Sequence, residues 1–340
     1  MKAVFITKPG GPGVVHIKET AEPQLKDGQA LVRVRAAGIN YAEVVIRTGF
    51  YPDAPPFPFI PGYEFSGIVE KVQNTATIKI GEKVMGVTMF GGQAQLVAVN
   101  EEQLLPFAET MSFETAAAIP VNYLTAYIAL IKFGHLQQGE KVLIHSCAGG
   151  VGTAAVQLAL AHKAEVYGLT SSDEKIEYIR RQGVHHAINY KKEDFTEVIN
   201  NLTSGKGVDI VLDSVGGPIF KRSLKLLSGG GRIICYGVTD MMASGRKRLW
   251  RIAWKYFTSP RVKILDLMQN NLGIYGLALN RFISDMSTIR PILEKILSLY
   301  SQGLIKPAIS RIYGLDEISA AHAHLESGKS IGKLILNLNN

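Results

Sequence analysis

The chain reads KVLIHSCAGGVG from Lys141 to Gly152. An apolar strand candidate, Val142–Ile144, leads into a glycine-rich turn, and a helical pattern follows over Thr153–His162. Small residues in such a turn let the backbone approach a pyrophosphate, and the N-terminus of the next helix offers it free N–H groups and a partial positive charge. Because the glycines have a strand before them and a helix after them, the pattern favours a dinucleotide-binding unit over an ordinary tight turn.

Strand and helix candidates alternate around and beyond this turn. The strand candidates are Lys141–Ser146, Glu165–Thr170, Ala187–Tyr190, Val208–Ser214 and Gly231–Gly237, and the helix candidates between them are Thr153–His162, Asp173–Gln182, Phe195–Leu202 and Pro218–Leu227. This alternation predicts an α/β fold with a doubly wound parallel sheet and right-handed crossovers.

The flanking parts of the chain have other patterns. The first 100 residues are β-rich, with strand candidates at Ala30–Ala36, Gly67–Val72, Lys83–Thr88 and Ala94–Val99. Tyr51–Pro61 holds five prolines and predicts an ordered loop or a lid. Helices are expected from Ser112 to Ala118, from Asn122 to Phe133, from Ile289 to Tyr300 and from Leu315 to Leu325, and strands at Leu272–Leu279 and Lys333–Leu338.

Composition limits the class of protein. A chain of 340 residues holds about two domains. No apolar run reaches the roughly 18 residues of a membrane span, and MKAVFITKPG lacks the layout of a signal peptide, so we expect a cytoplasmic protein. The two cysteines, Cys147 and Cys235, are too few for a four-cysteine zinc site, and we expect both to be small packing residues. The eight histidines form no metal-binding pattern, and we expect them to be solvated or hydrogen-bonded.

The net charge of +8 is concentrated in one segment. Residues 246–263 carry seven basic residues, no acidic residue and both tryptophans, Trp250 and Trp254. Residues 246–257 fit a helix with a charged stripe, which is typical of a helix at an anionic membrane surface but also of one that covers a substrate cleft or a dimer seam. Nucleic acid is not expected, because no recognition fold accompanies the patch.

Several motifs, in order and spacing, resemble those of a known superfamily. They are GINYAEVVIRTGFYP (Gly38–Pro52), PGYEFSGIVE (Pro61–Glu70), TAY (Thr125–Tyr127), AGGVG (Ala148–Gly152), DSVGG (Asp213–Gly217) and GKLIL (Gly332–Leu336). From Met1 to about Leu338 the chain resembles the zinc-independent quinone oxidoreductase branch of the medium-chain dehydrogenase/reductase superfamily, and within it the vesicle amine transport protein homologues.

The resemblance implies a domain plan and the absence of zinc. A GroES-like catalytic domain is expected over residues 1–121, a Rossmann NADP-binding domain over 122–282 with a basic helical insertion at about 241–265, and a return to the catalytic domain over 283–340, in a homodimer. Zinc-using relatives carry metal ligands where Asn40, Tyr63 and Val121 stand here, and these residues cannot make a thiolate and imidazole site.

The cofactor is expected to be NADPH. Hydroxyls and an ammonium at the end of the second strand suit a 2′-phosphate, whereas NAD-selective folds place a carboxylate there. Asp173 is an acid at this position that speaks against a 2′-phosphate, and a role at the helix N-terminus would explain it. The residues assigned to the cofactor, in part by the resemblance, are Ala148, Gly149, Gly150, Val151, Gly152, Ser171, Ser172, Lys175, Tyr190, Gly237 and Lys333.

Without zinc, hydrogen-bond donors must polarise the acceptor oxygen of the substrate. The resemblance points to Asn40, Tyr51 and Tyr63, with Thr125 beside the nicotinamide; a turn residue at Asn40 and packing or capping at the others are the alternatives. Glu43 and Glu64 are expected to have structural hydrogen-bonding roles. The expected reaction is hydride or electron transfer to a quinone. Reduction of a conjugated C=C bond in an enone or enoyl substrate is the alternative, and a membrane- or lipid-associated protein that retains the fold is an alternative of another class.

Overall fold

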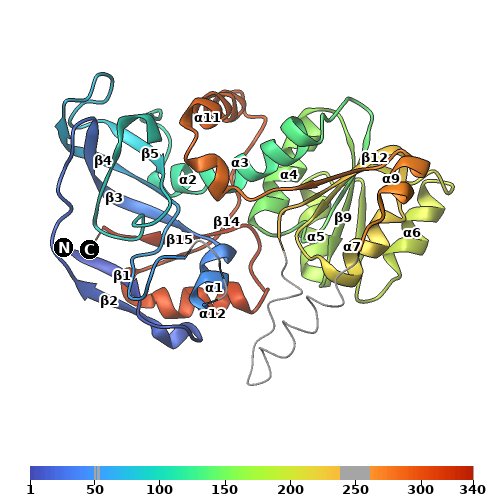
Figure 1. Cartoon of the computed structure of the whole chain (residues 1–340), viewed down its shortest axis with the longest axis horizontal. Coiled ribbons are helices and arrows are strands. Elements are labelled where there is room, and N and C mark those ends of the chain that lie inside the picture. Colours follow the sequence, from blue (N-terminus) through green and yellow to red (C-terminus); the bar gives the residue numbers. More distant parts are fainter. Residues whose placement is uncertain (50, 52–53, 238–260, 340) are drawn as a thin grey trace. The chain divides into compact units, whose positions relative to one another are not determined.

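The computed structural model describes residues 1–49, 51, 54–237 and 261–339, and it separates into two compact units (Figure 1). One unit comprises Met1–Leu124 together with Leu279–Asn340, and the other comprises Thr125–Ala278. The first unit is therefore discontinuous in sequence, because the chain leaves it, forms the second unit and returns. The basic segment 246–257 with both tryptophans lies outside the described residues, apart from its continuation at Arg261–Lys263.

The unit Thr125–Ala278 contains a six-stranded parallel sheet in the order β10-β9-β8-β11-β12-β13. Its strands are β8 (Lys141–Ile144), β9 (Glu165–Thr170), β10 (His186–Asn189), β11 (Val208–Asp213), β12 (Leu227–Cys235) and β13 (Gly273–Gly276). The chain runs outward from β8 in one direction to β10 and then from β11 in the other. The strand order thus reverses between β8 and β11, which is where open α/β sheets bind their ligands.

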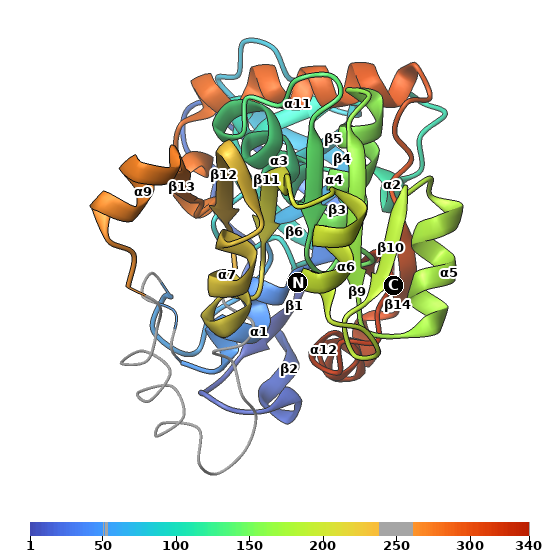
Figure 2. The same ribbon diagram turned by 90° about the vertical axis from the view of Figure 1, so that its right-hand side faces the viewer.

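Helices connect these strands, and all but α9 correspond to helices that the sequence pattern predicted. They are α4 (Gly150–Ala161), α5 (Asp173–Arg181), α6 (Phe195–Leu202), α7 (Gly217–Leu224) and α9 (Ile264–Asn270). Helices α6 and α7 lie against the sheet (Figure 2). Their apolar residues, such as Phe195, Ile199 and Leu224, pack with buried residues of the strands, such as Leu143 and Val211. Because a parallel strand is covered on both faces, its side chains are apolar in succession, and this explains the continuous runs of valine, leucine and isoleucine.

The other unit is β-rich. A seven-stranded sheet has the order β14-β15-β3-β4-β5-β7, with β6 also paired to β3, and β1 and β2 form a two-stranded sheet. The strands are β1 (Lys2–Ile6), β2 (Val15–Glu19), β3 (Gln29–Ile39), β4 (Glu64–Gln73), β5 (Lys83–Val87), β6 (Leu96–Asn100), β7 (Leu104–Pro106), β14 (Ile309–Tyr313) and β15 (Lys333–Asn337). Strand β15 pairs antiparallel with β3, Leu334 opposite Ile39, so the C-terminal stretch completes the N-terminal sheet.

Helices surround this sheet and continue into the other unit. They are α1 (Tyr41–Arg47), α2 (Phe113–Ala117), α10 (Asn280–Ile283), α11 (Met286–Ser301) and α12 (Ile318–Glu326), while α3 (Pro120–Tyr127) crosses the boundary and is followed by a π-helix, η3 (Ile128–Phe133). Short 3₁₀ turns stand at η1 (Pro12–Val14), η2 (Glu101–Gln103) and η5 (Leu315–Glu317). The side chain of Ser112 accepts a hydrogen bond from the backbone N–H of Thr115, which is the N-cap expected for α2.

The structure departs from the sequence patterns at element ends. Helix α1 was not anticipated, because its residues Val44, Val45 and Ile46 are β-branched and favour a strand by propensity alone. Helix α11 begins at Met286, three residues earlier than expected, since Asp285 caps it. Strand β12 begins at Leu227, and α7 accordingly ends at Leu224. Among the described helices, none has both the length and the apolarity required to span a bilayer.

Candidate active site

The glycine turn joins β8 to α4 with little room for side chains. Gly149 is the N-cap of α4, and the helix begins at Gly150. A Cβ atom added at Gly152 would lie 2.3 Å from the carbonyl oxygen of Ser146 and 2.7 Å from that of Cys147. The helix N-terminus can therefore pack this closely against the turn only with glycine at 152. Ala148 and Val151 complete the turn, whose first helical N–H groups are suited to bind phosphate.

Cys147 holds this turn against the sheet. Its backbone N–H donates to the carbonyl of Leu169 in β9 at 3.0 Å, and its side chain is fully buried. Burial raises the pKa of the Cys147 thiol far above its usual range, so the thiol stays protonated and unreactive. Burial also raises the pKa of Cys235, to about 12. Both cysteines are thus protonated packing residues.

The carboxyl ends of β8, β11 and β12 meet beside the glycine turn. Ser214, just after β11, donates from Oγ to Oγ of Ser146 at 2.9 Å. Gly237, just after β12, lies so close to Ser214 that an added Cβ would be 2.7 Å from the Ser214 carbonyl oxygen. Asp213 accepts hydrogen bonds from the backbone N–H groups of Val215 and Gly216 at 2.8 and 3.0 Å and fixes the DSVGG turn. These contacts hold the ends of β11 and β12 close to the glycine turn.

The expected ribose-binding residues gather at the ends of β9 and β10. Ser172 is the N-cap of α5 and accepts from the backbone N–H of Lys175 at 3.4 Å. The backbone N–H of Tyr190 donates to the carbonyl of Thr170 at 3.1 Å, which brings Tyr190, 45% exposed, beside Ser171. The pKa of Lys175 is lowered, chiefly by partial burial and also by the charge of Lys191. This end of the sheet therefore presents hydroxyls and cations.

Asp173, the first residue of α5, is neutralised by its neighbours. Lys192 Nζ lies 2.6 Å from Asp173 Oδ2, and Asn189 Nδ2 donates to Oδ1 at 3.0 Å. These two hydrogen bonds hold the pKa of Asp173 below its usual range. The sequence interpretation treated Asp173 as a helix-end acid and overlooked Lys191 and Lys192. The signal was available, since both lysines directly follow Tyr190 at the end of a strand candidate.

In the β-rich unit Asn40 belongs to a buried polar cluster. Asn40 Nδ2 donates to Glu64 Oε1 at 3.0 Å, and the backbone N–H of Val121 donates to Glu64 Oε2 at 2.7 Å. Lys333 Nζ forms an ion pair with Glu64 and donates to Asn40 Oδ1. Glu64 is fully buried and Lys333 is 3% exposed. Asn40, Glu64 and Lys333 are called the Asn40 cluster below.

The contacts within the Asn40 cluster bear on what the sequence led us to expect of Asn40, Lys333 and Glu64. Asn40 has φ −115° and ψ 146°, which is ordinary extended backbone, so a special turn conformation does not explain the residue. Lys333, assigned to the cofactor, has its ammonium bound within the protein. Glu64 has the structural hydrogen-bonding role that was expected. In the described part of the chain no three His, Cys, Asp or Glu side chains come together as a possible metal site.

Tyr63 directly precedes Glu64 of the Asn40 cluster, and its ring belongs to a row of aromatic side chains. Its ring is 5.5 Å from that of Phe90, which is 5.6 Å from Phe59, which in turn is 5.3 Å from Phe57. Tyr63 is 3% exposed, whereas Phe57 and Phe90 are half-buried. The row runs into the proline-rich loop that also contains Tyr51. Thr125, 6% exposed, belongs to α3 and to the other unit.

The two histidines of α12 differ in their surroundings. His322 is fully buried, and neither ring nitrogen has a hydrogen-bond partner among the described residues. Its neighbour two positions on, His324, lies 2.7 Å from the hydroxyl of Tyr313 through Nδ1. The two rings therefore lie in different surroundings, as their spacing on α12 predicted.

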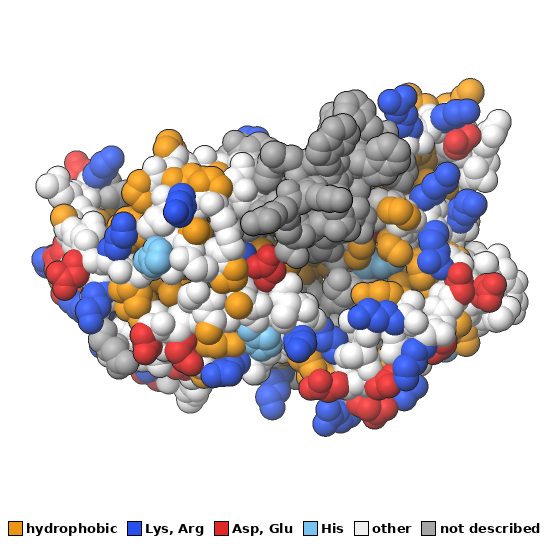
Figure 3. Space-filling model, turned by 90° about the horizontal axis from the view of Figure 1, so that it is seen from below, with side chains coloured by type: hydrophobic (Ala, Val, Ile, Leu, Met, Phe, Trp, Pro, Cys, Tyr) orange, Lys and Arg blue, Asp and Glu red, His pale blue; other side chains and the backbone are white. Residues whose placement is uncertain are grey.

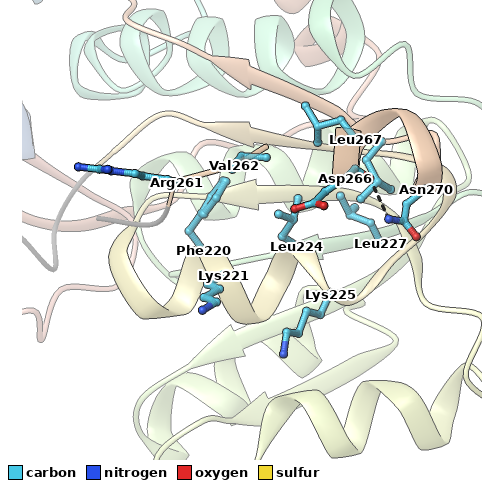
Figure 4. Close-up of a pocket in the computed structure, with 11 residues that line it drawn as sticks. Phe220, Lys221, Leu224, Lys225, Leu227, Arg261, Val262, Asp266, Leu267 and Asn270 are labelled. Atoms are coloured by element: carbon cyan, nitrogen blue, oxygen red, sulfur yellow. Dashed lines mark hydrogen bonds between the residues drawn. The ribbon is translucent and has the colours of Figure 1, made fainter. Parts of the chain in front are cut away.

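A separate pocket of about 450 Å³ lies between α7 and α9 (Figure 4). Its apolar lining includes Phe220, Leu224 and Leu267, and its charged lining includes Lys221 and Arg261. Next to it, α9 exposes Ile264, Leu265 and Met268 by 75%, 66% and 67%. On the face of the molecule in Figure 3, the described basic side chains are interspersed with acidic ones.

Comparison with known families and proteins gives two kinds of match. Residues 26–109 match the family model of the alcohol dehydrogenase GroES-like domain, and residues 182–336 match that of the zinc-binding dehydrogenases. A synaptic vesicle membrane protein VAT-1 homolog of Danio rerio is 37% identical over 98% of this chain and 69% of its own length. A quinone oxidoreductase of Pongo abelii is 31% identical over 99% of this chain and 98% of its own length.

Solved structures agree with these matches. The Escherichia coli quinone oxidoreductase complexed with NADPH has a TM-score of 0.88 and 29% sequence identity, over 99% of this chain and all of its own. The CurK enoyl reductase has a TM-score of 0.82 and 25% identity, over 99% of this chain and 98% of its own. These structures share the α/β sheet and the β-rich unit with this chain, so the expected fold class is confirmed.

Proposed function

The chain belongs to the medium-chain dehydrogenase/reductase superfamily, close to VAT-1 homologues and quinone oxidoreductases, and we propose that it is a zinc-independent, NADPH-dependent quinone reductase. When bound, the nicotinamide supplies a hydride, and the protein contributes position and electrostatics. The observation that carries the proposal is the Asn40 cluster. It puts an amide and an ammonium, rather than a set of metal ligands, at the place where zinc-using relatives hold their metal.

The residues present fit a dinucleotide phosphate. Gly152 lets the N-terminus of α4 pack directly on the glycine turn, so that its first N–H groups are available to phosphate. Ser171, Ser172, Lys175 and Tyr190 would hold a 2′-phosphate, since Lys192 pairs with Asp173. The NADPH complex of the Escherichia coli enzyme supports the same cofactor for this chain.

A quinone suits the groups in the β-rich unit. It accepts a hydride readily and requires hydrogen-bond donors rather than a strong acid. We assign the polarising role to the Asn40 amide with the hydroxyls of Tyr51 and Tyr63, and assign Thr125 to the nicotinamide amide. The half-buried rings of Phe57 and Phe90 would offer an apolar surface to a flat, aromatic-like substrate.

The experiment follows NADPH oxidation with a panel of quinones and enones, with NADH as the control cofactor. Turnover of a quinone with NADPH preferred is the expected result. Asn40→Ala should lower kcat about 10-fold to 1000-fold, as loss of a transition-state hydrogen-bond donor does, while NADPH binding stays intact. Unchanged turnover in that variant would refute the assignment of Asn40.

Two other functions have specific support. Reduction of a conjugated C=C bond is favoured by the likeness to an enoyl reductase, and turnover of the enones alone in the same panel would select it. A membrane- or lipid-associated role is favoured by the exposed apolar residues of α9 beside Arg261 and Lys263. Co-sedimentation with anionic liposomes at low salt tests that role, and absence of binding would exclude it.

A further inference from the structure

Helices α1 and α12 pack against each other and bury polar side chains between them (Figure 1). Each helix contributes two polar residues four positions apart, Glu43 and Arg47 from α1 and His322 and Glu326 from α12. Residues at this spacing share one face of a helix. Glu43, Arg47 and His322 are each fully buried, which is unusual for ionisable side chains. The polar face of each helix is therefore turned into the protein.

The direct contacts satisfy only part of this group. Arg47 Nη2 donates to Glu326 Oε2 at 2.5 Å, and Gln93 Nε2, from the loop before β6, donates to Glu43 Oε2 at 2.7 Å. His322 Nε2 lies 4.0 Å from Glu43 Oε2, which is too long for a hydrogen bond. Glu43, Arg47, Gln93 and His322 are called the α1–α12 seam.

Six buried atoms of the seam have no hydrogen-bond partner among the described residues. They are Glu43 Oε1, Arg47 Nε, Arg47 Nη1, Gln93 Oε1, and His322 Nδ1 and Nε2. Each unpaired buried polar atom destabilises the folded state, and six together would cost roughly as much as the whole free energy of unfolding of a typical protein. A stable fold therefore requires that these atoms bind something other than protein.

Of the possible partners for these six atoms, water fits their hydrogen-bonding chemistry best. Arg47 offers only donors, Gln93 Oε1 is an acceptor, and a neutral imidazole is one of each. An anion only accepts, so it would leave the acceptors unpaired, and a metal cation would be repelled by the Arg47 guanidinium. Water both donates and accepts. One water molecule can also bridge the 4.0 Å between His322 Nε2 and Glu43 Oε2. It would make two hydrogen bonds of about 2.8 Å that meet at the water oxygen at an angle of about 90°.

Charge pairing indicates where a proton resides. The cations near Glu43 are Arg47 on its own helix and Lys333 of β15, and each is already paired with a carboxylate, Glu326 and Glu64 respectively. Glu43 is the acid without a cation of its own, since its direct partner Gln93 is neutral and His322 faces it at 4.0 Å.

The surroundings favour the neutral form of both groups. Burial raises the pKa of Glu43 to about 8, Lys333 and Gln93 oppose the rise, and Glu64 adds to it. Burial, with the charge of Arg47, lowers the pKa of His322 to about 3. Near neutral pH the seam then holds a carboxylic acid and a neutral imidazole. Because Oε2 of Glu43 accepts from Gln93, the proton belongs on Oε1, where it is one more donor toward water.

We propose that the α1–α12 seam is a buried binding site for ordered water molecules and for one proton, which is carried by Glu43. Water bridges Glu43 to His322 and binds Arg47, and in this way ties α1 to α12. Asn40 is the N-cap of α1, one turn from Glu43, so the hydrated seam also holds the Asn40 amide in place. The site depends on these four side chains and not on which substrate the protein reduces.

Infrared spectroscopy of the purified full-length protein tests the proton. A protonated carboxyl group has a C=O stretch that ionised surface acids lack near neutral pH. The band is expected at pH 6 to 7 and should be lost as the pH rises through about 8. It should be absent in Glu43→Gln and unchanged in Glu109→Gln, whose acid is 81% exposed. Absence of the band in the wild type, or its persistence in Glu43→Gln, would overturn the proposal.

A crystal structure that resolves ordered solvent tests the water. Water oxygens are expected between Glu43 and His322 and beside Arg47 Nε; a dry seam or an ion at Arg47 would overturn the proposal. Folding of Glu43→Gln is a further test, since an amide is the nearest mimic of a protonated carboxyl. Its melting temperature at pH 6 to 7 should lie above that of Glu109→Gln, because an amide needs no proton on folding whereas unfolded Glu43 is ionised at that pH. A clear loss relative to that control would mean that Glu43 is ionised in the folded protein.

Discussion

Replacing Lys333 by methionine should destabilise the β-rich unit strongly, because it leaves Glu64 as a buried charge. Glu64 is fully buried, and with the ammonium gone its carboxylate retains only two neutral donors, Asn40 Nδ2 at 3.0 Å and the Val121 N–H at 2.7 Å. Removing one partner of a buried ion pair costs about 3–5 kcal/mol. At about 2–4 °C per kcal/mol for a unit of this size, the melting temperature should fall by about 6–20 °C.

A double-mutant cycle separates this charge effect from lost packing. Glu64→Gln alone leaves the ammonium of Lys333 buried without a carboxylate and should also destabilise. In the double variant Lys333→Met/Glu64→Gln no charge remains unpaired, so a coupling energy of at least about 2 kcal/mol should be recovered. Lys329→Met is the matched control, because Lys329 precedes the same strand and is exposed. Thermal unfolding by calorimetry gives all five melting temperatures, the wild type included.

Two results would refute the reasoning: a Lys333→Met variant as stable as Lys329→Met, or a double variant whose destabilisation equals the sum of the single effects. The double variant also tests the cofactor assignment of Lys333 without the stability effect. If the ammonium binds a phosphate when the cofactor is present, the double variant should bind NADPH at least 10-fold more weakly. Unchanged affinity would restrict Lys333 to its pair with Glu64.

The remaining predictions concern the cofactor site and pH. Lys175→Gln should raise KM for NADPH about 10–100-fold and leave KM for NADH unchanged, and equal effects on both cofactors would contradict a 2′-phosphate contact. Gly152→Ala should abolish NADPH binding in a titration, because its Cβ would meet backbone at 2.3 Å, whereas Gly149→Ala, with its nearest contact at 3.2 Å, should retain it. The free energy of unfolding, measured at a series of pH values, should fall by about 5 kcal/mol between about pH 4.5 and 8. In this range Glu43 is ionised in the unfolded chain but still protonated in the folded protein, so the fall should vanish in Glu43→Gln. The free energy of unfolding should also fall as the pH drops from about 6.5 to 3. In this range His322 gains a proton in the unfolded chain but not in the folded protein, so His322→Gln should remove that fall.

The sequence predicted the parallel sheet well because its signals are local. Continuous apolar runs such as Val208–Asp213 are typical of strands covered on both faces, and the glycine turn before α4 needs small residues for reasons that neighbours along the chain determine. Boundaries were less accurate where a local signal competed with packing. Helix α1 shows this best, since its β-branched residues favour a strand, yet burial of Val44 and Ile46 stabilises a helix there.

The polar interior could not be predicted in the same way, because its meaning depends on which helix faces which. Glu43 with Arg47, and His322 with Glu326, are four residues apart, and such pairs are normally found on the solvated face of a helix. The sequence contains nothing to show that α1 and α12, nearly 300 positions apart, turn these faces toward each other. In the folded protein Arg47 pairs with Glu326, and Lys333 pairs with Glu64. Glu43 and His322 are then left without an opposite charge among the described residues. The two uncharged members follow from the packing, and so does the need for water between them.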